Sequence, residues 1–302
     1  NHPNSSSSSF ILVGVPSLES FHTCLGLLFC SGYVITLVGN GLVLLVIGLD
    51  DSLRDPVHCF LGMLAVVDVV MVTSVVPRML SVFWLKSVEI GYVACFVQMF
   101  LVHSATAEES GVLLAMAVDR YLAICHPLRY KTILSHRTTA RIGLAIVARA
   151  VLLVVPLTGM VANLPYCRSR VVSHSYCEHM AVAKLTCADP RPSGRYSVAV
   201  SSLVVGVDVA GIAGSYGMIL QLTLGKKWCW KTFSTCGSHI CVLLLYYIPG
   251  VLSIYMQHFS SSASLPAQVL LADFYLTLPT MLNPIVYSMR TKQLRQAVLR
   301  ML

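Results

Sequence analysis

Acidic side chains occur inside long apolar stretches of this sequence of 302 residues, where an ionised group is costly. Asp68 and Glu109 each lie near the middle of an apolar stretch, and Ser110 follows Glu109 directly. Carboxylate and hydroxyl oxygens are hard ligands, so these three residues could hold a sodium ion. Alternatively, one carboxyl group simply carries a proton, because burial and a nearby like charge both disfavour its ionised form. Asp208 and Arg149 lie in two other apolar stretches, and either could be a satisfied structural polar group.

Further polar residues lie at the ends of apolar stretches. Asp119 and Arg120 are adjacent, so they can pair in one conformational state and separate in another, although in isolation they would indicate only an interfacial anchor. In the segment 283–287, Pro284 lacks a backbone N–H, so the helix loses the hydrogen bond that this N–H would donate to the carbonyl four residues earlier. Because an amide and a phenol flank the break and give the freed carbonyls local partners, this segment suits a hinge.

The sequence does not indicate an enzyme or a nucleic-acid-binding protein. It shows no nucleophile–base set and no metal-ligand cluster beyond Asp68 and Glu109. Its net charge of +8 comes from short basic clusters between apolar stretches rather than from one basic face of a polar domain. That distribution is typical of membrane topology signals.

We expect these residues to lie on membrane-spanning helices. The chain is 56% hydrophobic and only 11% charged, whereas soluble domains carry roughly 25% charged residues. Seven stretches are long enough to cross a bilayer, at about 24–49, 57–82, 92–125, 139–164, 196–225, 233–258 and 265–289. Their continuous apolar character excludes a β-barrel, and the lack of internal repeats disfavours a transporter. We therefore predict an all-α membrane protein, a seven-transmembrane helix bundle spanning 24–289, with a short amphipathic C-terminal helix at 290–302.

The distribution of basic residues predicts the orientation of this bundle. Lys and Arg are more numerous in the tail and in the loops after the first, third and fifth spans than on the other side. The positive-inside rule therefore places the tail in the cytoplasm and residues 1–23 outside the cell. The glycosylation sequon Asn4-Ser5-Ser6 lies in this N-terminal segment and agrees with that orientation.

The positions of the cysteines also agree with this orientation. Of the 11 Cys, Cys95, Cys167, Cys177 and Cys187 fall on the predicted outer side, where disulfides persist. Four Cys allow three pairings, and the sequence alone does not choose among them.

Several motifs in the same order along the chain resemble those of vertebrate olfactory receptors, a branch of the rhodopsin-like G-protein-coupled receptors. The segment Met116–Tyr130, which contains Asp119-Arg120-Tyr121, is similar to the third-helix signature of that family. The other matching segments are Gly39-Asn40, Leu64–Asp68, Ser215-Tyr216, Lys231–His239 and Asn283–Tyr287. Residues 77–80, 173–179 and 182–189 look like class I, or fish-like, receptors. This resemblance implies disulfides between Cys95 and Cys177 and between Cys167 and Cys187.

The resemblance also implies a small volatile or semi-volatile ligand bound between the third, fifth and sixth spans. The expected ligand-binding residues are His103, Thr106, His179, Ser201, Val204, Val205, Gly250, Val251, Ile254 and His258. His258 stands where many class I receptors carry an arginine. Because imidazole anchors a carboxylate less firmly than guanidinium does, an alcohol, aldehyde or ketone is as reasonable a ligand as a fatty acid.

The implied function is that of an odorant receptor that activates a stimulatory, olfactory-type G protein and raises cAMP. The expected switch and coupling residues are Asp119, Arg120, Tyr216, Tyr247, Asn283 and Tyr287. Lys226–Lys231 and Lys292–Arg300 suit the G protein and the cytoplasmic membrane lipids. The expected location is the plasma membrane of olfactory cilia. A metabolite-sensing receptor outside the nose is an alternative, and a transporter or channel is a distant one.

Overall fold

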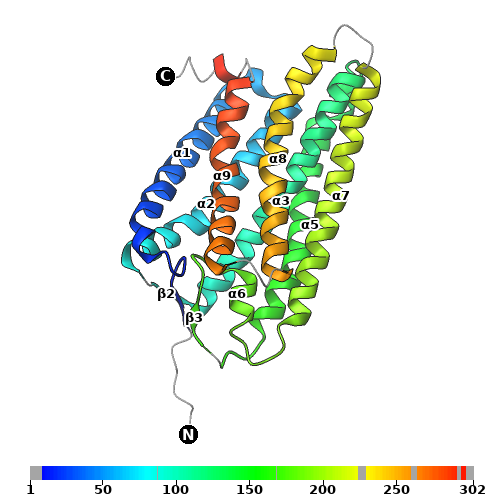
Figure 1. Ribbon diagram of the computed structural model, residues 1–302. Helices are drawn as coiled ribbons and strands as arrows, with labels where there is room; N and C mark the ends of the chain where they lie inside the picture. The colour runs from blue at the N-terminus through cyan, green and yellow to red at the C-terminus, as the bar shows by residue number, and fades with distance from the viewer. Residues whose placement is uncertain are drawn as a thin grey trace.

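Seven long helices run side by side in the described part of the computed structural model, which comprises residues 9–86, 88–167, 169–223, 229–259, 264–290 and 294–296 (Figure 1). They are α1 (His22–Leu49), α2 (Pro56–Leu85), α3 (Tyr92–Cys125), α5 (His136–Ala162), α7 (Arg191–Thr223), α8 (Cys229–Phe259) and α9 (Leu265–Arg290). Within these described residues, six stretches are long and apolar enough to cross a membrane. The remaining long helix is α3, which carries Glu108, Glu109, Asp119 and Arg120. The predicted helical membrane bundle is thus confirmed.

Several helices extend beyond the apolar stretches that predicted them. Helix α5 begins at His136 rather than at 139, because Ser135 caps it and accepts a hydrogen bond from the Thr138 N–H at 3.4 Å. Helix α2 begins at Pro56, whose missing N–H costs nothing at a first helical position. Helix α7 begins at Arg191 rather than at 196. Hydropathy marks the membrane-buried part of a helix, whereas the hydrogen-bonded helix continues into the polar interface.

A small three-stranded sheet lies at one end of the bundle (bottom of Figure 1), and the sequence analysis did not predict it. Strand β1 (Ser9–Leu12) pairs antiparallel with β2 (Val88–Gly91) and parallel with β3 (Val171–Val172). The segment predicted only as an extracellular N-terminus is therefore partly folded against the loops. We call this end, which also carries both disulfides, the disulfide end, and the opposite end, where α9 stops, the tail end.

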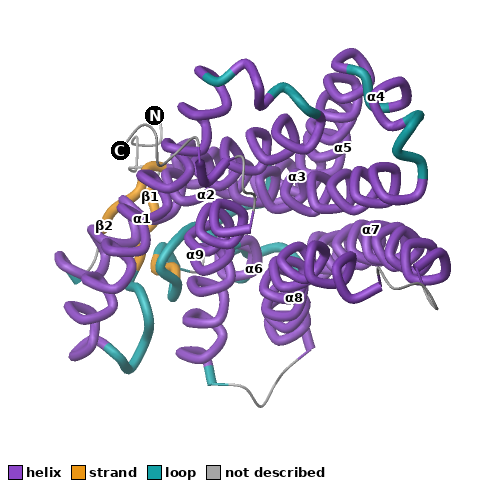
Figure 2. Tube along the Cα trace, turned by 90° about the horizontal axis from the view of Figure 1, so that it is seen from above, coloured by secondary structure: helices purple, strands orange, loops and turns teal. Residues whose placement is uncertain are grey.

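Short helical turns complete the connections. They are the 3-10 turns η1 (Glu19–Phe21) and η2 (Asp51–Leu53) and the helices α4 (Tyr130–Ile133) and α6 (His179–Ala183). A view down the bundle shows α2, α3 and α5 on one side and α9, α8 and α7 on the other (Figure 2). Helix α3 contacts α2, α5, α7 and α8, so its side chains face most of the interior.

The end of the chain is described only in part. Residues 294–296 form a helical turn, and Leu294 is fully buried against Val43, Val46 and Leu53. The rest of the predicted tail helix after Arg290 lies outside the described residues. The turn at 294–296 therefore packs back onto α1 at the tail end.

Candidate ligand-binding site

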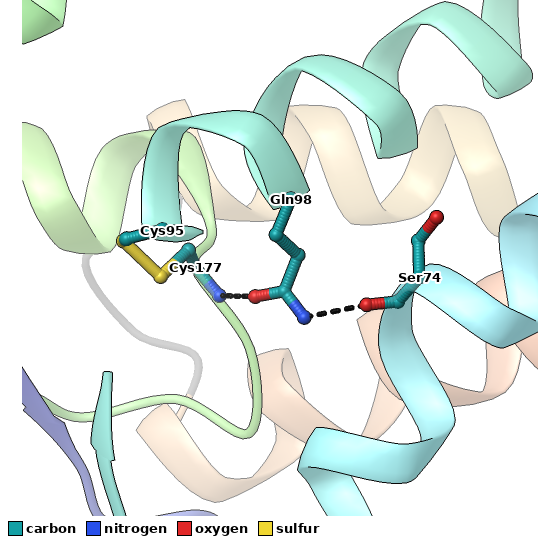
Figure 3. The surroundings of a disulfide bond; sticks show 4 residues. All are labelled: Ser74, Cys95, Gln98 and Cys177. Carbon is teal, nitrogen blue, oxygen red and sulfur yellow. Dashed lines mark hydrogen bonds between the residues drawn. A yellow bond between two sulfur atoms is a disulfide. The ribbon is translucent and has the colours of Figure 1, made fainter. Parts of the chain in front are cut away.

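Two disulfides fix the loop that follows α5 at the disulfide end. Cys95 of α3 is bonded to Cys177, and Cys167 is bonded to Cys187, which are the pairs that the resemblance implied. Gln98 supports the first bridge: its Oε1 accepts from the Cys177 N–H at 2.9 Å, and its Nε2 donates to the Ser74 carbonyl at 2.7 Å (Figure 3). One side chain thus joins the backbones of α2, α3 and the loop.

The same loop is anchored to α9. Ser175 Oγ donates to Asp273 Oδ2 at 2.8 Å, and both residues are fully buried. Next to Ser175, burial lowers the pKa of His174 to about 3. The ring is therefore neutral at physiological pH, and its Nδ1 accepts from the Ser175 N–H at 3.0 Å.

A cavity of about 120 Å³ lies beneath this loop, between α3, α5, α7 and α8. Eight of the predicted ligand-binding residues line it: His103, Thr106, Ser201, Val204, Val205, Gly250, Val251 and Ile254. His179 does not line the cavity but packs edge-on against His103, with ring centroids 6.1 Å apart. For His258, only the backbone is described, so the predicted contact of its side chain falls outside the described atoms.

Part of the cavity lining was not predicted from the sequence. The additional residues that shape the cavity include Leu153, Val154 and Leu157 of α5, Tyr176 and Glu178 of the loop, Tyr246 and Gln257 of α8, and Tyr275 of α9. The i, i+1, i+4 spacing of the three α5 residues indicates one helix face, but it does not say which neighbour that face meets. The loop residues were recognisable only as neighbours of Cys177.

Gly250 has a steric role that its position in the sequence did not indicate. A Cβ atom there would lie 2.7 Å from Cε2 of Tyr275, which is closer than carbon atoms can approach. The glycine therefore lets the Tyr275 ring reach the cavity between α8 and α9. Below it, Tyr246 Oη donates to the Thr106 carbonyl at 2.6 Å and ties α8 to α3.

A buried ion pair lies under the cavity. The Arg149 Nη1 and Nη2 atoms lie 2.6 and 2.9 Å from the two carboxylate oxygens of Asp208, and Nη2 also donates to the Ala107 carbonyl. Ser110 Oγ donates to Asp208 Oδ2 at 2.6 Å and lies 2.9 Å from Tyr247 Oη. Because Ser110 and Tyr247 both line the cavity, a ligand there would sit next to this network.

A second polar centre is closer to the tail end and contains the predicted acidic pair. Asn283 Nδ2 lies 3.1 and 3.2 Å from the two oxygens of Asp68 and 3.4 Å from Glu109 Oε1. Among the described residues, no Lys or Arg forms an ion pair with either carboxylate. The predicted grouping of Ser110 with this pair is wrong, because its hydroxyl is bonded to Asp208 and Tyr247.

The oxygen donors of this centre suit a monovalent cation. Two buried carboxylates share one amide group, and that amide points its N–H atoms at both of them. The Asn283 amide offers these carboxylates only the partial positive charge of its N–H groups. A sodium ion held by Asp68 and Glu109 would supply a full positive charge. In the part of the chain that the structure describes, no group of three or more His, Cys, Asp or Glu residues forms a metal site.

The predicted switch residues are held by several local contacts. Arg120 Nε lies 3.7 Å from Asp119 Oδ2, and Tyr130 Oη donates to Asp119 Oδ1 at 2.7 Å. Tyr216 Oη lies 2.6 Å from Nδ1 of His239, a residue that the sequence analysis did not single out. Tyr247 lies in the Asp208 network and Asn283 in the acidic pair, as described above.

Tyr287 differs from the other switch residues. It is buried against the core, and its hydroxyl has no hydrogen-bond partner among the described residues. The predicted glycosylation site Asn4 lies outside the described residues. The same holds for most of the predicted basic contact segments 226–231 and 292–300.

The helical membrane bundle, the tethered loop and the small cavity beneath it define a multi-pass membrane receptor of the G-protein-coupled class. The sequence comparisons narrow this class. The family model described as olfactory receptor matches residues 29–302. Olfactory receptor 52I2 of Homo sapiens is 50% identical to this chain over 302 residues, covering 99% of this chain and 86% of the relative. Olfactory receptor 52I1 of Homo sapiens is 48% identical, covering 99% and 93%.

A third relative, olfactory receptor 51E1 of Homo sapiens, is 42% identical and covers 100% of this chain and 95% of its own length. The chain therefore belongs to the olfactory receptor family. Its members are receptors and not enzymes. The resemblance on which the sequence analysis relied is confirmed.

Proposed function

We propose that this receptor binds a small, neutral, hydrogen-bonding volatile molecule in the cavity beneath the loop. The observation that carries the proposal is the mixed lining of that cavity. Valine, leucine and isoleucine side chains form most of its wall, and His103, Ser197, Ser201 and Gln257 supply polar groups. Small-ligand sites generally have this composition, with a few polar groups that orient an otherwise apolar ligand.

The charge of the lining disfavours a carboxylate ligand. Glu178 lines the cavity, and none of the described lining residues is a Lys or Arg. A carboxylate buried here would face a like charge without a permanent cation, which is costly. Alcohols, aldehydes and ketones avoid that cost, because one hydrogen bond from a residue such as His103 satisfies their oxygen atom.

The size of the cavity restricts the ligand further. An apolar protein cavity of about 150 Å³ admits benzene, and this cavity measures about 120 Å³. We therefore expect the best agonist to be close to a benzene ring in size. In a homologous series of alcohols or ketones, potency should peak at a short chain and then fall.

Ligand binding would favour the active arrangement of the bundle by a population shift. We propose that the active arrangement engages a stimulatory, olfactory-type G protein through the tail end near Arg120 and raises cAMP. The proposed orientation places the disulfide end outside the cell and the tail end in the cytoplasm, with the receptor in ciliary membranes and in contact with their lipids. Use of the same receptor as a metabolite sensor in other tissues is the alternative function.

The test is a cAMP reporter screen of cells that express the full chain, against matched series of alcohols, aldehydes, ketones and acids. For the best agonist, His103→Ala should raise the half-maximal concentration about fivefold, the equivalent of one lost hydrogen bond of about 1 kcal/mol. His136→Ala is the control, because this exposed histidine lies at the other end of the bundle. Acids as the strongest agonists, or unchanged potency in His103→Ala, would contradict the proposal.

A further inference from the structure

A groove opens between α2 and α3 near the disulfide end, separate from the ligand cavity. Its volume is about 410 Å³. It lies on the outer surface of the bundle, because Thr73, Pro77, Ala94 and Val97, which all line it, are exposed. Its inner wall includes Gln98, the side chain that joins α2 to the disulfide (Figure 3). The groove is therefore open to the membrane that surrounds the receptor.

Arg78 supplies the charge of this groove. It lies within α2, seven residues before the last helical residue Leu85, which corresponds to about 10 Å along the axis. No hydrogen bond or ion pair to its guanidinium occurs among the described residues. Charged residues at membrane depth normally pair with an anion or with backbone carbonyls. Arg78 therefore needs an anion from outside the chain.

None of the other described groove-lining residues is an anion, and three of the polar side chains are already hydrogen-bonded within the chain. Ser74 Oγ donates to the Val70 carbonyl at 2.6 Å, and Ser81 Oγ donates to the Pro77 carbonyl at 3.0 Å. The amide oxygen and nitrogen of Gln98 are both hydrogen-bonded as well. The groove thus combines the cation of Arg78 with a wall that, in the described part of the chain, offers it no anionic partner.

The remaining wall is apolar and continues onto the surface that faces lipid. Ala94, Val97 and Leu101 lie on α3, and Val97 is 51% exposed. Trp84, 49% exposed, lies near the end of α2, where aromatic residues typically mark the membrane–water interface. A ligand that contacts both Arg78 and this apolar wall must carry an anionic head group close to the interface and a hydrocarbon tail that extends deeper into the membrane.

We propose that the groove binds a membrane phospholipid, whose phosphate pairs with Arg78 and whose acyl chain lies along Pro77, Ala94, Val97 and Leu101. The planar guanidinium can donate two parallel hydrogen bonds to phosphate oxygens, which suits such a head group. This inference rests on the membrane insertion of the bundle and not on the identity of the odorant. Under the proposed orientation, the lipid belongs to the outer leaflet.

The test is native mass spectrometry of the purified full-length receptor in detergent micelles that contain dioleoylphosphatidylglycerol. Dioleoylglycerol, which has the same acyl chains without a phosphate, is the comparison lipid. The receptor should retain one phosphatidylglycerol molecule, and Arg78→Gln should weaken this retention at least about tenfold, because a charge-assisted, bidentate contact is lost. Arg195→Gln is the matched control: Arg195 is an exposed residue near the same end of α7 and does not line the groove.

A second variant tests the groove without changing its charge. Ala94→Trp should fill the groove and weaken retention of phosphatidylglycerol, while agonist-stimulated cAMP shows that the protein still folds. Equal retention by Arg78→Gln and the wild type, equal losses in Arg78→Gln and Arg195→Gln, or equal retention of dioleoylglycerol would overturn the proposal. So would full competition by soluble glycerol phosphate, because a head group alone would then be sufficient.

Discussion

The ion pair of Arg149 with Asp208 and the acidic pair of Asp68 with Glu109 both bury carboxylates between apolar helices. They satisfy those carboxylates by different means. Asp208 is fully buried and receives two hydrogen bonds from Arg149, whose side chain is 29% exposed, and one from Ser110. Asp68 and Glu109 share one amide group, that of Asn283, and have no cationic side chain among the described residues.

Because of this difference, we expect the ion pair of Arg149 with Asp208 to have a structural role and the acidic pair to act as a switch. Removing one partner of a buried ion pair leaves an unpaired charge, so the Arg149–Asp208 pair is expected to hold α5 and α7 together in every state. The acidic pair can change its charge by taking up a proton or a cation. We therefore expect mutations in the first centre to alter stability and mutations in the second to alter signalling.

The ion pair also shapes the backbone around it. A Cβ atom at Gly111 would lie 2.9 Å from Arg149 Nη2 and 2.9 Å from a side-chain carbon of Ile146. The glycine therefore allows α5 to approach α3 closely enough for the guanidinium to reach Asp208 across the helix. The acidic pair depends instead on α9, which brings Asn283 to both carboxylates.

Among these variants, Arg149→Met is expected to lose the most stability. This variant leaves Asp208 buried without a cation, so we expect it to lower the free energy of unfolding by about 3–5 kcal/mol. Thermal unfolding of the solubilised receptor and its surface expression in cells measure the loss. Arg141→Met, a change at an exposed arginine of the same helix, should have little effect.

The double variant Arg149→Met/Asp208→Leu tests whether the unpaired charge of Asp208 causes this loss of stability. Because apolar residues of similar size replace both charges, the double variant should recover much of the stability that the single variant loses. If Arg149→Met were as stable as the wild type, the Arg149–Asp208 ion pair would not have this structural role.

An intermediate effect is expected at the acidic pair, where we propose that a sodium ion binds. Replacing N-methylglucamine chloride with sodium chloride at equal ionic strength should stabilise the wild type by about 0.4–1.4 kcal/mol, if sodium is at one to ten times its dissociation constant. Asp68→Asn and Glu109→Gln should each abolish this gain and change basal cAMP. Each should leave stability in the sodium-free buffer nearly unchanged, since one of two like charges is removed.

Two outcomes would contradict the sodium site or the switching role expected for the acidic pair. One is equal stability of the wild type in the two salts, which would leave a shared proton as the means of neutralising the pair. The other is wild-type basal signalling in both single variants, which would show that the acidic pair has no switching role.

A much smaller loss of stability than that of Arg149→Met is expected for Ser110→Ala. Asp208 keeps both hydrogen bonds from Arg149, so the loss should be about 1 kcal/mol, the typical value of one hydrogen bond. Tyr247 loses the one hydrogen bond to this network that the described residues show, so agonist potency should shift more than stability does. Ser104→Ala is the matched control on α3, because the buried Ser104 hydroxyl has no hydrogen-bond partner among the described residues. Equal effects of Ser110→Ala and Ser104→Ala would show that Ser110 does not couple the bound ligand to the Asp208 network.

The pattern of apolar residues was enough to predict the helical membrane class and the approximate position of each long helix. Apolar stretches of span length leave few other folds, because backbone groups in lipid must be hydrogen-bonded within their own helix. The sequence also identified four residues that are costly to bury, namely Asp68, Glu109, Arg149 and Asp208, but not the fully buried Asp273. The small sheet was not predictable in this way, because β1 has only four residues and its partners are far along the chain.

Which of these polar residues are partners was visible only in the folded bundle. Arg149 and Asp208 are 59 positions apart, and Asp68 and Asn283 are 215 positions apart, so no local spacing rule connects them. Adjacent residues on a helix point in directions about 100° apart, which is why Glu109 and its neighbour Ser110 belong to different centres. The partner of each group follows from how the helices are rotated and packed against one another, and that geometry depends on the whole bundle.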